Sequence, residues 1–260
     1  MSEVAAHYEN LLARHYTWML GADFEELVAE QRQLLDSLDI SAFEPNAIVL
    51  DLGCGSGIHS VALAQLGYAT VISIDVSPTL VAELTARTSA YPAIRPVHAD
   101  LCAGLDAAVE PQSIATAVCM GDTLPHLPDT TAIGRLVEDV FNVLTPGGTF
   151  VLTFRDLTIP LAGLDRFIQV RADHERIMTC FLEDESDAVR VHDLIHTRDA
   201  DGTWRLGKSS YRKLRLPPTW VSGLLREVGF VVAPVKSGPY GMCVITARRP
   251  ERARPVRAVP

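Results

Sequence analysis

The sequence lacks any hydrophobic run long enough to form a membrane helix. Its longest apolar stretches, such as AIVL and IATAVCM, fall far short of the roughly 20 residues that such a helix requires. The first segment, MSEVAAHYENLLARHY, carries charges and histidines where a secretory signal needs an unbroken apolar core. We therefore expect a cytoplasmic protein with no membrane partner.

Cysteine is scarce, with five residues in 260, and no two cysteines have the C-x-x-C spacing. Four of the five lie in apolar surroundings, which favours small buried side chains over ligands or disulfides. His192 and His196 have the i, i+4 spacing of a helical metal pair, but VRVHDLIHT alternates like a strand and would hold the rings apart. The sequence therefore predicts no metal site.

Basic residues are also fewer than acidic ones. Lys and Arg number 23 against 32 Asp and Glu, giving a net charge of −9. A negative surface repels the phosphate backbone, so we expect no nucleic-acid partner. The basic end of the chain is an exception, and residues 249–260 are expected to form a flexible tail. Hydrophobic residues make up 48% of the chain, which is typical of a globular protein with a sizeable core.

From residue 47 onwards, short apolar segments alternate with helical ones. AIVLDLG, ATVISID, AIRPVHAD, SIATAVCM and GTFVLTFR are expected strands, and helical patterns separate most of them. This alternation predicts an α/β fold with a Rossmann-like, doubly wound sheet that is mostly parallel. Pro96 predicts an irregular or edge position for the third strand. The closely spaced FVVAPV and GMCVITAR predict a final antiparallel pair at the sheet edge.

Two further regions interrupt or precede this core. Residues 1–46 show helical spacing and predict an N-terminal helical cap, with Asp23 capping its second helix. Residues 156–216 contain period-2 segments separated by turn residues, which predict an inserted antiparallel β lid. The core domain is therefore expected over residues 47–155 and 217–248.

The most informative stretch is V-L-D-L-G-C-G-S-G at residues 49–57, where the first strand meets the first helix. Gly53, Gly55 and Gly57 allow a tight turn and a close approach of a ligand to the backbone. A glycine turn without a ligand is the alternative, but the flanking strand and helix favour a binding site.

The glycine spacing disfavours a dinucleotide. The third glycine comes one residue earlier than in G-x-G-x-x-G, and Ile58 occupies the position of a small residue. Asp51 would repel phosphates but suits a ligand that carries an ammonium group. Asp75 and Asp100 end the second and third strands, where carboxylates can contact a ribose and an adenine edge. These features predict a phosphate-free nucleoside with an amino-acid arm.

The ordered motifs VLDLGCGSG, VISIDVS, VHADL, AVCMGD and LTPGGTFVLTFR resemble those of small-molecule class I S-adenosylmethionine-dependent methyltransferases. The resemblance covers about residues 47–155 and 217–248. It implies S-adenosyl-L-methionine as the cofactor and S-adenosyl-L-homocysteine as the product. The cofactor-binding residues that it implies are Asp51, Gly53, Cys54, Gly55, Gly57, Asp75, Val76, Asp100, Leu101 and Met120.

A narrower likeness follows the fourth strand. GDTLPHLPD, at residues 121–129, is similar to a loop of the glycine N-methyltransferase family, which also has an arginine where Arg155 stands. The likeness implies that Arg155 acts on an anionic group of the substrate, and the position of His126 and Asp122 on the loop after the fourth strand, where a base is needed, makes them candidate catalytic residues. His126 can act as a base or pack within the loop. Asp122 can orient the acceptor, cap the loop or bind the methionyl ammonium, and Arg155 can clamp an anionic group or form a surface ion pair.

This sequence departs from the glycine N-methyltransferase pattern at two positions. Asp122 replaces an amide residue and Leu157 replaces a tyrosine, so a small polar acceptor other than glycine is expected. The loop also lacks the [D/N]-P-P-[Y/F/W] sequence that holds a flipped nucleobase. Tyr16, Trp18 and Tyr211 are expected substrate contacts in a lid over the cofactor, with core packing as the alternative.

The sequence therefore predicts a methyltransferase that acts on a nitrogen or oxygen of a small polar metabolite. We expect it to be a monomer or a homodimer. An NAD(P)-dependent oxidoreductase and a non-catalytic cofactor-binding homologue are the alternatives.

Overall fold

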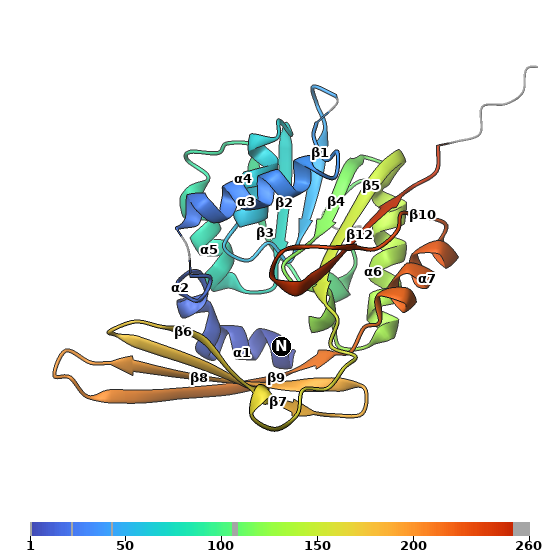
Figure 1. Cartoon of the computed structure of the whole chain (residues 1–260). Coiled ribbons are helices and arrows are strands. Elements are labelled where there is room, and N and C mark those ends of the chain that lie inside the picture. Colours follow the sequence, from blue (N-terminus) through green and yellow to red (C-terminus); the bar gives the residue numbers. More distant parts are fainter. Residues whose placement is uncertain (1, 22, 43, 106–108, 252–260) are drawn as a thin grey trace, which may run out of the picture.

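The computed structural model describes residues 2–21, 23–42, 44–105 and 109–251. Its central sheet has the order β10-β12-β5-β4-β1-β2-β3, in which β1 to β5 run parallel and β12 runs antiparallel to β5 (Figure 1). The expected Rossmann-like architecture is confirmed. The strands are β1 (Ile48–Leu52), β2 (Thr70–Asp75), β3 (Ile94–His98), β4 (Ile114–Cys119), β5 (Leu144–Arg155), β10 (Val231–Val232), β11 (Lys236–Ser237) and β12 (Met242–Arg248).

Helices cover both faces of this sheet (Figure 1). On one face, α6 and α7 contribute Leu136 and Leu225 to a core cluster, and on the other α3, α4 and α5 contribute side chains such as Leu35 and Leu63. Ser77 caps α5, accepting a hydrogen bond from the Leu80 N–H at 3.2 Å. The helices are α3 (Phe24–Asp36), α4 (Ile58–Gln65), α5 (Pro78–Arg87), α6 (Thr130–Val143) and α7 (Pro218–Val228).

The sheet edges agree with the proline positions. β3 contains Pro96 and is an edge strand, as expected, because proline cannot donate to a second neighbour. The prediction of a strand over all of FVVAPV was wrong. The observed strand, β10, contains only Val231 and Val232, and the segment leaves the ladder before Pro234. The antiparallel pairing of β10 with β12 is confirmed.

The inserted segment forms a second sheet of four antiparallel strands, called here the lid sheet, which lies below the core in Figure 1. Along β8 the buried residues alternate with half-buried ones, so one face of the lid sheet is turned inward. His192 and His196 lie in β8, as expected from their strand-like surroundings. The strands are β6 (Phe167–Ala172), β7 (Arg176–Asp184), β8 (Ala188–Arg198) and β9 (Trp204–Leu214).

The N-terminal segment is helical but less regular than its sequence spacing predicts. It consists of α1 (Glu3–His7), the π-helical turn η1 (Tyr8–Leu12), the 3₁₀ turn η2 (Ala13–His15) and α2 (Tyr16–Met19). In Figure 1, α1 lies between the lid sheet and the core. The remaining 3₁₀ turns are η3 (Leu101–Ala103), η4 (Leu124–His126), η5 (Gly163–Arg166) and η6 (Pro239–Gly241).

Three sequence expectations concern features outside these elements. Most of the basic tail, residues 252–260, lies outside the described residues. Within the described ranges, no helix combines the length and apolar character needed to cross a bilayer. Across the same ranges, no three His, Cys, Asp or Glu side chains are grouped so as to hold a metal ion, and all five cysteines are free.

Candidate active site

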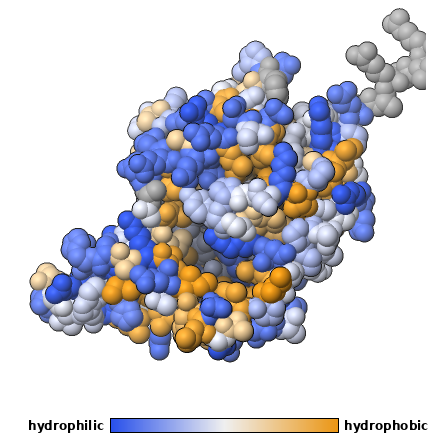
Figure 2. Space-filling view, in the orientation of Figure 1, coloured by the Kyte–Doolittle hydropathy of each residue, from blue (hydrophilic) through white to orange (hydrophobic). Residues whose placement is uncertain are grey.

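A cavity of about 350 Å³ lies at the carboxyl ends of the parallel strands. The N-terminal segment and β9 contribute to its walls, and Figure 2 shows the surface hollowed between the lid sheet and the core. This is the edge of a doubly wound sheet where ligands bind. The predicted site residues that line it are Tyr16, Gly53, Gly55, Asp75, Val76, Asp100, Leu101 and His126.

The glycine turn between β1 and α4 forms one wall. Gly53 has a φ of +74°, and a Cβ atom there would lie 2.3 Å from Cγ2 of Thr123. Gly55 has a φ of +55°, and its Cβ would lie 3.2 Å from the ring of Tyr16. Glycine adopts this left-handed conformation without a steric cost and leaves the backbone open to a ligand. The turn is therefore shaped for a close approach.

Asp75, at the end of β2, holds the glycine turn in place. Its Oδ2 atom accepts a hydrogen bond from the Gly55 N–H at 2.8 Å, and its Oδ1 atom accepts from the Ser77 N–H at 2.9 Å. Burial raises the pKa of this carboxyl group, although the backbone donors oppose that effect. A carboxylate has about four acceptor positions, so Asp75 retains capacity for ligand hydroxyl groups.

Asp51 lies behind the cavity wall and not on it. It is fully buried, and its Oδ2 atom accepts a hydrogen bond from Oγ of Ser60 at 2.6 Å. Ser60 in turn accepts from Oγ of Ser73 at 2.9 Å. The Oδ1 atom of Asp51 is buried with no hydrogen-bond partner, and burial raises the pKa of the group to about 7. The sequence analysis missed both serines.

Asp100 and Leu101 line the other end of the cavity, after β3. Oδ1 of Asp100 accepts a hydrogen bond from the Cys102 N–H at 2.9 Å, which caps η3. Asp100 is therefore both a cap and a cavity residue. Three other predicted cofactor residues lie behind the wall: Cys54 and Met120 are buried, and Gly57 immediately precedes α4.

Asp122 and Arg155, two of the predicted catalytic residues, bind each other and do not line the cavity. The Oδ1 atom of Asp122 accepts from the Arg155 N–H at 2.9 Å, and Oδ2 accepts from Nη1 of Arg155 at 3.0 Å. Lys213 of β9 also pairs with Oδ2. Burial acts to raise the pKa of Asp122, but Lys213 and these hydrogen bonds outweigh it and lower the pKa. Asp122 is therefore an ionised anchor, not a base.

His126 lines the cavity as a neutral imidazole. Its Nε2 atom is buried with no hydrogen-bond partner. Burial, and then the nearby Lys213 cation, lower the pKa of His126 to about 3. The Tyr8 ring lies 6.1 Å away and the Tyr211 ring 5.2 Å away, measured between centroids. His126 can accept a hydrogen bond from a ligand but holds a proton only weakly.

The predicted aromatic substrate residues are divided between the cavity and the lid. Tyr16 lines the cavity, whereas Tyr211 is buried between His126 and His7. Trp18 does not line the cavity: its Nε1 atom donates to Asp173 Oδ2 at 2.6 Å, which supports the packing alternative. Tyr8, which the sequence analysis did not select, lines the cavity. Other unanticipated wall residues include Ser2, Val4, Thr123, Leu127, Pro128 and Arg212.

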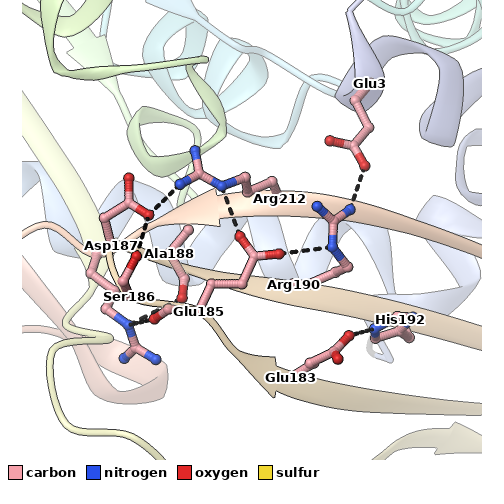
Figure 3. A network of polar contacts seen from close by, with 10 residues as sticks. Glu3, Glu183, Glu185, Ser186, Asp187, Ala188, Arg190, His192 and Arg212 are labelled. Carbon is pink, nitrogen blue, oxygen red and sulfur yellow. Dashed lines mark hydrogen bonds and ion pairs between the residues drawn. The ribbon is translucent and has the colours of Figure 1, made fainter.

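A network of ion pairs joins α1 to the lid sheet beside the cavity (Figure 3). Glu3 of α1 pairs with Nη1 of Arg190 at 2.6 Å, and Arg190 pairs with Glu185 at 2.9 Å. Glu185 also pairs with Nε of Arg212 at 2.9 Å, and Arg212 pairs with Asp187. Because Glu3 and Arg212 both line the cavity, this network fixes part of its rim.

Comparisons with known proteins agree with this geometry. Residues 49–148 match a family described as a methyltransferase domain. A ubiquinone biosynthesis O-methyltransferase from Xanthomonas campestris pv. campestris (strain B100) is 41% identical over 113 residues, or 42% of this chain and 43% of the relative. The chain thus spans less than half the length of the first curated relatives that it matches.

A longer match identifies the family. The ubiquinone biosynthesis O-methyltransferase of Cupriavidus pinatubonensis (strain JMP 134 / LMG 1197) is 32% identical over 176 residues, which cover 64% of this chain and 68% of the relative. Together with the fold and the glycine turn, this match shows that the chain belongs to the class I S-adenosylmethionine-dependent methyltransferases.

The fold similarity also includes the lid sheet. The S-adenosylmethionine-bound structure of CalS10, an amino pentose methyltransferase from Micromonospora echinaspora, has a TM-score of 0.70 and 19% identity. That similarity covers 91% of this chain and 95% of CalS10. At this identity the comparison concerns the fold alone.

The residues of the cavity fit S-adenosylmethionine. Gly53 and Gly55 let Thr123 and Tyr16 approach the turn closely, and the turn, these two side chains and Asp75 line the same cavity. The Oδ1 atom of Asp51, behind the wall, is buried with no hydrogen-bond partner, and the ionised carboxylate would attract a cation held in the cavity nearby. The wall contains no cluster of arginine or lysine for a pyrophosphate, since Arg212 is the basic side chain that lines it among the described residues.

Proposed function

We propose that the protein transfers a methyl group from S-adenosylmethionine to a nitrogen or oxygen atom of a small polar metabolite. The observation that carries the proposal is that the glycine turn, Asp75, Asp100 and His126 line one cavity. Its volume of about 350 Å³ lies at the lower end of the range for small-molecule sites. We therefore infer a small acceptor that binds beside the cofactor.

In this proposal, the cofactor lies along the carboxyl ends of β1, β2 and β3. The glycine turn would hold the methionyl arm with Asp51 behind it, Asp75 would accept hydrogen bonds from the ribose, and Asp100 with Leu101 would contact the adenine. Bound S-adenosylmethionine supplies an electrophilic methyl group on a positively charged sulfur. The protein contributes mainly alignment, and positioning alone accounts for about 7–11 kcal/mol in well-oriented intramolecular reactions.

His126 is proposed to orient the acceptor. Its buried Nε2 atom accepts a hydrogen bond from the N–H or O–H group of the acceptor, which directs the acceptor lone pair at the methyl carbon. As the new bond to carbon forms, the carbon–sulfur bond breaks and its electron pair stays on sulfur. An amine that arrives neutral keeps its protons until the product leaves, whereas an oxygen acceptor must lose a proton to a base.

The low basicity of His126 favours a nitrogen acceptor. With a pKa of about 3, its imidazole is a poor recipient for the proton of a hydroxyl group, but a neutral amine needs no such transfer. The likeness to ubiquinone biosynthesis O-methyltransferases supports oxygen, so an oxygen acceptor stays in the proposal as the second candidate. We rank an amine first and a phenol or alcohol second.

The N-terminal cap, residues 1–46, and the inserted segment, residues 156–216, are proposed to form a lid that excludes water. Ser2, Val4 and Tyr8 of the first and Arg212 of the second contribute to the cavity wall. A closed, dry site strengthens the electrostatic contacts that align the reactants. The same two segments would determine which acceptors fit.

Calorimetry with S-adenosylhomocysteine and NADH tests the cofactor, and a mass-shift screen with S-adenosylmethionine tests the acceptor. We expect binding of S-adenosylhomocysteine but not NADH, and a gain of one methyl group on an amine among amines, phenols and carboxylates. His126→Gln should lower turnover at least about tenfold, whereas the control His196→Gln, in the lid sheet outside the cavity wall, should not. Binding of NADH, or no methylation of any compound class, would contradict the proposal.

A further inference from the structure

Two neighbouring inward residues of β9 hold the two ends of the loop that carries His126. Residues two apart on a strand share a face, so Tyr211 and Lys213 both point toward the core. The Tyr211 ring packs edge-on against His126, with centroids 5.2 Å apart and planes at 87°. Lys213 pairs with Asp122 at the start of the same loop. The lid sheet therefore contacts the segment 122–126 at both of its ends, through Lys213 at Asp122 and through Tyr211 at His126.

Asp122 lies where this loop is strained. Its φ of +77° places a non-glycine residue in the left-handed region, directly after Gly121, whose φ is +69°. Such a conformation persists when surrounding contacts compensate for its cost. Here the compensating contacts come from both parts of the molecule, because Arg155 binds Asp122 from the core and Lys213 binds it from the lid sheet.

Lys213 is buried together with the carboxylate that it pairs with. Its side chain is about nine-tenths buried and Asp122 is 3% exposed, so the ion pair lies inside the protein. Buried ion pairs contribute little net stability but can fix one arrangement of the groups around them. The arrangement that this pair fixes is the loop beneath His126.

We propose that Lys213 is a positioning residue for methyl transfer: from the lid sheet it holds the Asp122 loop so that the His126 imidazole faces the acceptor. The inference rests on the orienting role proposed above for His126. It makes the acceptor site depend on docking of the lid sheet, because β9 supplies Lys213 and Tyr211 while the core supplies Asp122 and His126.

The charges around His126 support this coupling. The groups that face it are Lys213 from β9, Asp122 from its own loop and His7 from α1, together with the Tyr8 and Tyr211 rings. Burial lowers its pKa most, Lys213 lowers it further, and Asp122 opposes both. Lys213 therefore helps to keep Nε2 free to accept a hydrogen bond, and without it burial and His7 alone oppose the Asp122 carboxylate.

Histidine-ring NMR titration tests the proposal without a known acceptor. The full chain is titrated with S-adenosylhomocysteine present, and the His126 resonance is assigned with His126→Gln. Lys213→Met should raise the His126 pKa by at least about one unit, and Lys213→Arg should keep it low. Lys208→Met removes an exposed charge from the same strand and should leave it unchanged. An unshifted His126 in Lys213→Met would overturn the proposal.

A second variant guards against misfolding. Lys213→Met leaves Asp122 with one cation in a buried site, so the double variant Asp122→Asn with Lys213→Met removes both charges. Because Lys213 has the larger effect on His126, the pKa should rise in the order wild type, double variant, single variant. Any other order would contradict the inference.

Turnover provides the second readout once the screen supplies an acceptor. Lys213→Met should lower kcat at least about tenfold at neutral pH with little change in the KM for S-adenosylmethionine, and Lys213→Arg should restore most of it. In Lys213→Met, the acid limb of the pH profile of kcat should move to higher pH, because a protonated His126 imidazole cannot accept the hydrogen bond. Failure of the wild type to bind S-adenosylhomocysteine would overturn the proposed function instead, and the His126 titration would still report on Lys213.

Discussion

The Nε2 atom of His7, on α1, lies 3.0 Å from Oδ2 of Asp193 on β8, and both side chains are buried. On its other side, the same N-terminal segment contacts the core through Glu9, whose carboxylate accepts hydrogen bonds from the hydroxyl groups of Ser77 and Thr79. The segment from α1 to η1 therefore contacts both the lid sheet and the Rossmann-like core. Its attachment at both ends explains why it can form a wall of the cavity.

We predict that His7→Ala destabilises the protein. The substitution leaves a buried carboxylate without its partner, which costs about 1–3 kcal/mol. Urea unfolding followed by circular dichroism measures the change. His192→Ala is the matched control, because His192 lies next to Asp193 on β8 but its pair with Glu183 of β7 is partly exposed, and the substitution should cost less than about 1 kcal/mol. Equal losses in the two variants would contradict the prediction.

Periodicity and turn residues were sufficient to predict the core architecture. The strands with continuous apolar sequences are buried on both faces, and Asp23 caps the helix that begins at Phe24, as expected. The irregular turn at Tyr8–Leu12 was not predictable, because its residues have ordinary helical spacing and the π-helical geometry depends on tertiary contacts. β10 is short because Pro234 cannot donate a hydrogen bond to the ladder, although the sequence pattern around it is strand-like.

Gly53→Ala is predicted to weaken cofactor binding. A Cβ atom would lie 2.3 Å from Thr123, and the left-handed backbone adds roughly 1–2 kcal/mol of strain. Isothermal calorimetry with S-adenosylhomocysteine should therefore show at least about a tenfold loss of affinity.

Gly163→Ala serves as the control for backbone strain alone. Gly163 also has a positive φ, +55°, but no atom outside its immediate chain neighbours lies within 4 Å of its added Cβ, and it is outside the cavity wall. It should lower stability slightly and leave the affinity unchanged. A parallel loss of affinity in both variants would indicate that strain, and not the shape of the turn, explains the effect.

Asp51 is predicted to make stability depend on pH. Because burial raises its folded-state pKa to about 7, the protonated form stabilises the fold. That contribution is complete below the ordinary aspartate pKa and is lost as the pH rises through about 7. Compared with Asp51→Asn, the wild type should lose on the order of 4 kcal/mol across this window. Parallel pH curves of the free energy of unfolding in the two proteins would refute the prediction.

We also predict that Asp51 releases a proton when S-adenosylhomocysteine binds. An ammonium placed near Asp51 favours the carboxylate and lowers its pKa from about 7. Binding of S-adenosylhomocysteine at mildly acidic pH should then release a proton, measured as a binding enthalpy that varies with the ionisation enthalpy of the buffer. Asp51→Asn should remove that variation. A buffer-independent enthalpy in the wild type would place the ammonium elsewhere.

The cavity residues at strand ends could be predicted from the sequence, as could Tyr16 of the N-terminal segment, whereas Tyr8 and Lys213 were missed. Asp75 and His126 follow strands of the core, so a motif in order along the chain reveals them. Lys213 and Tyr8 come from the lid sheet and the N-terminal segment, and their proximity to the site depends on how these parts dock. Asp122 and Arg155 were selected as separate catalytic candidates, and the sequence could not show that they pair with each other.

The N-terminal segment should be separable from the folded core if the cut is made before α3. Deleting residues 1–40 would remove Val28, Leu35 and Ile40, which are buried in the core cluster, so that variant should unfold. Deleting residues 1–20 removes Tyr8 and Tyr16 from the cavity wall but leaves α3 in place. We expect this shorter deletion to keep a cooperative unfolding transition and to lose at least about a hundredfold in turnover, since water enters the open site. Circular dichroism and the acceptor assay measure the two effects, and full turnover in the shorter deletion would show that the N-terminal segment is no part of the lid.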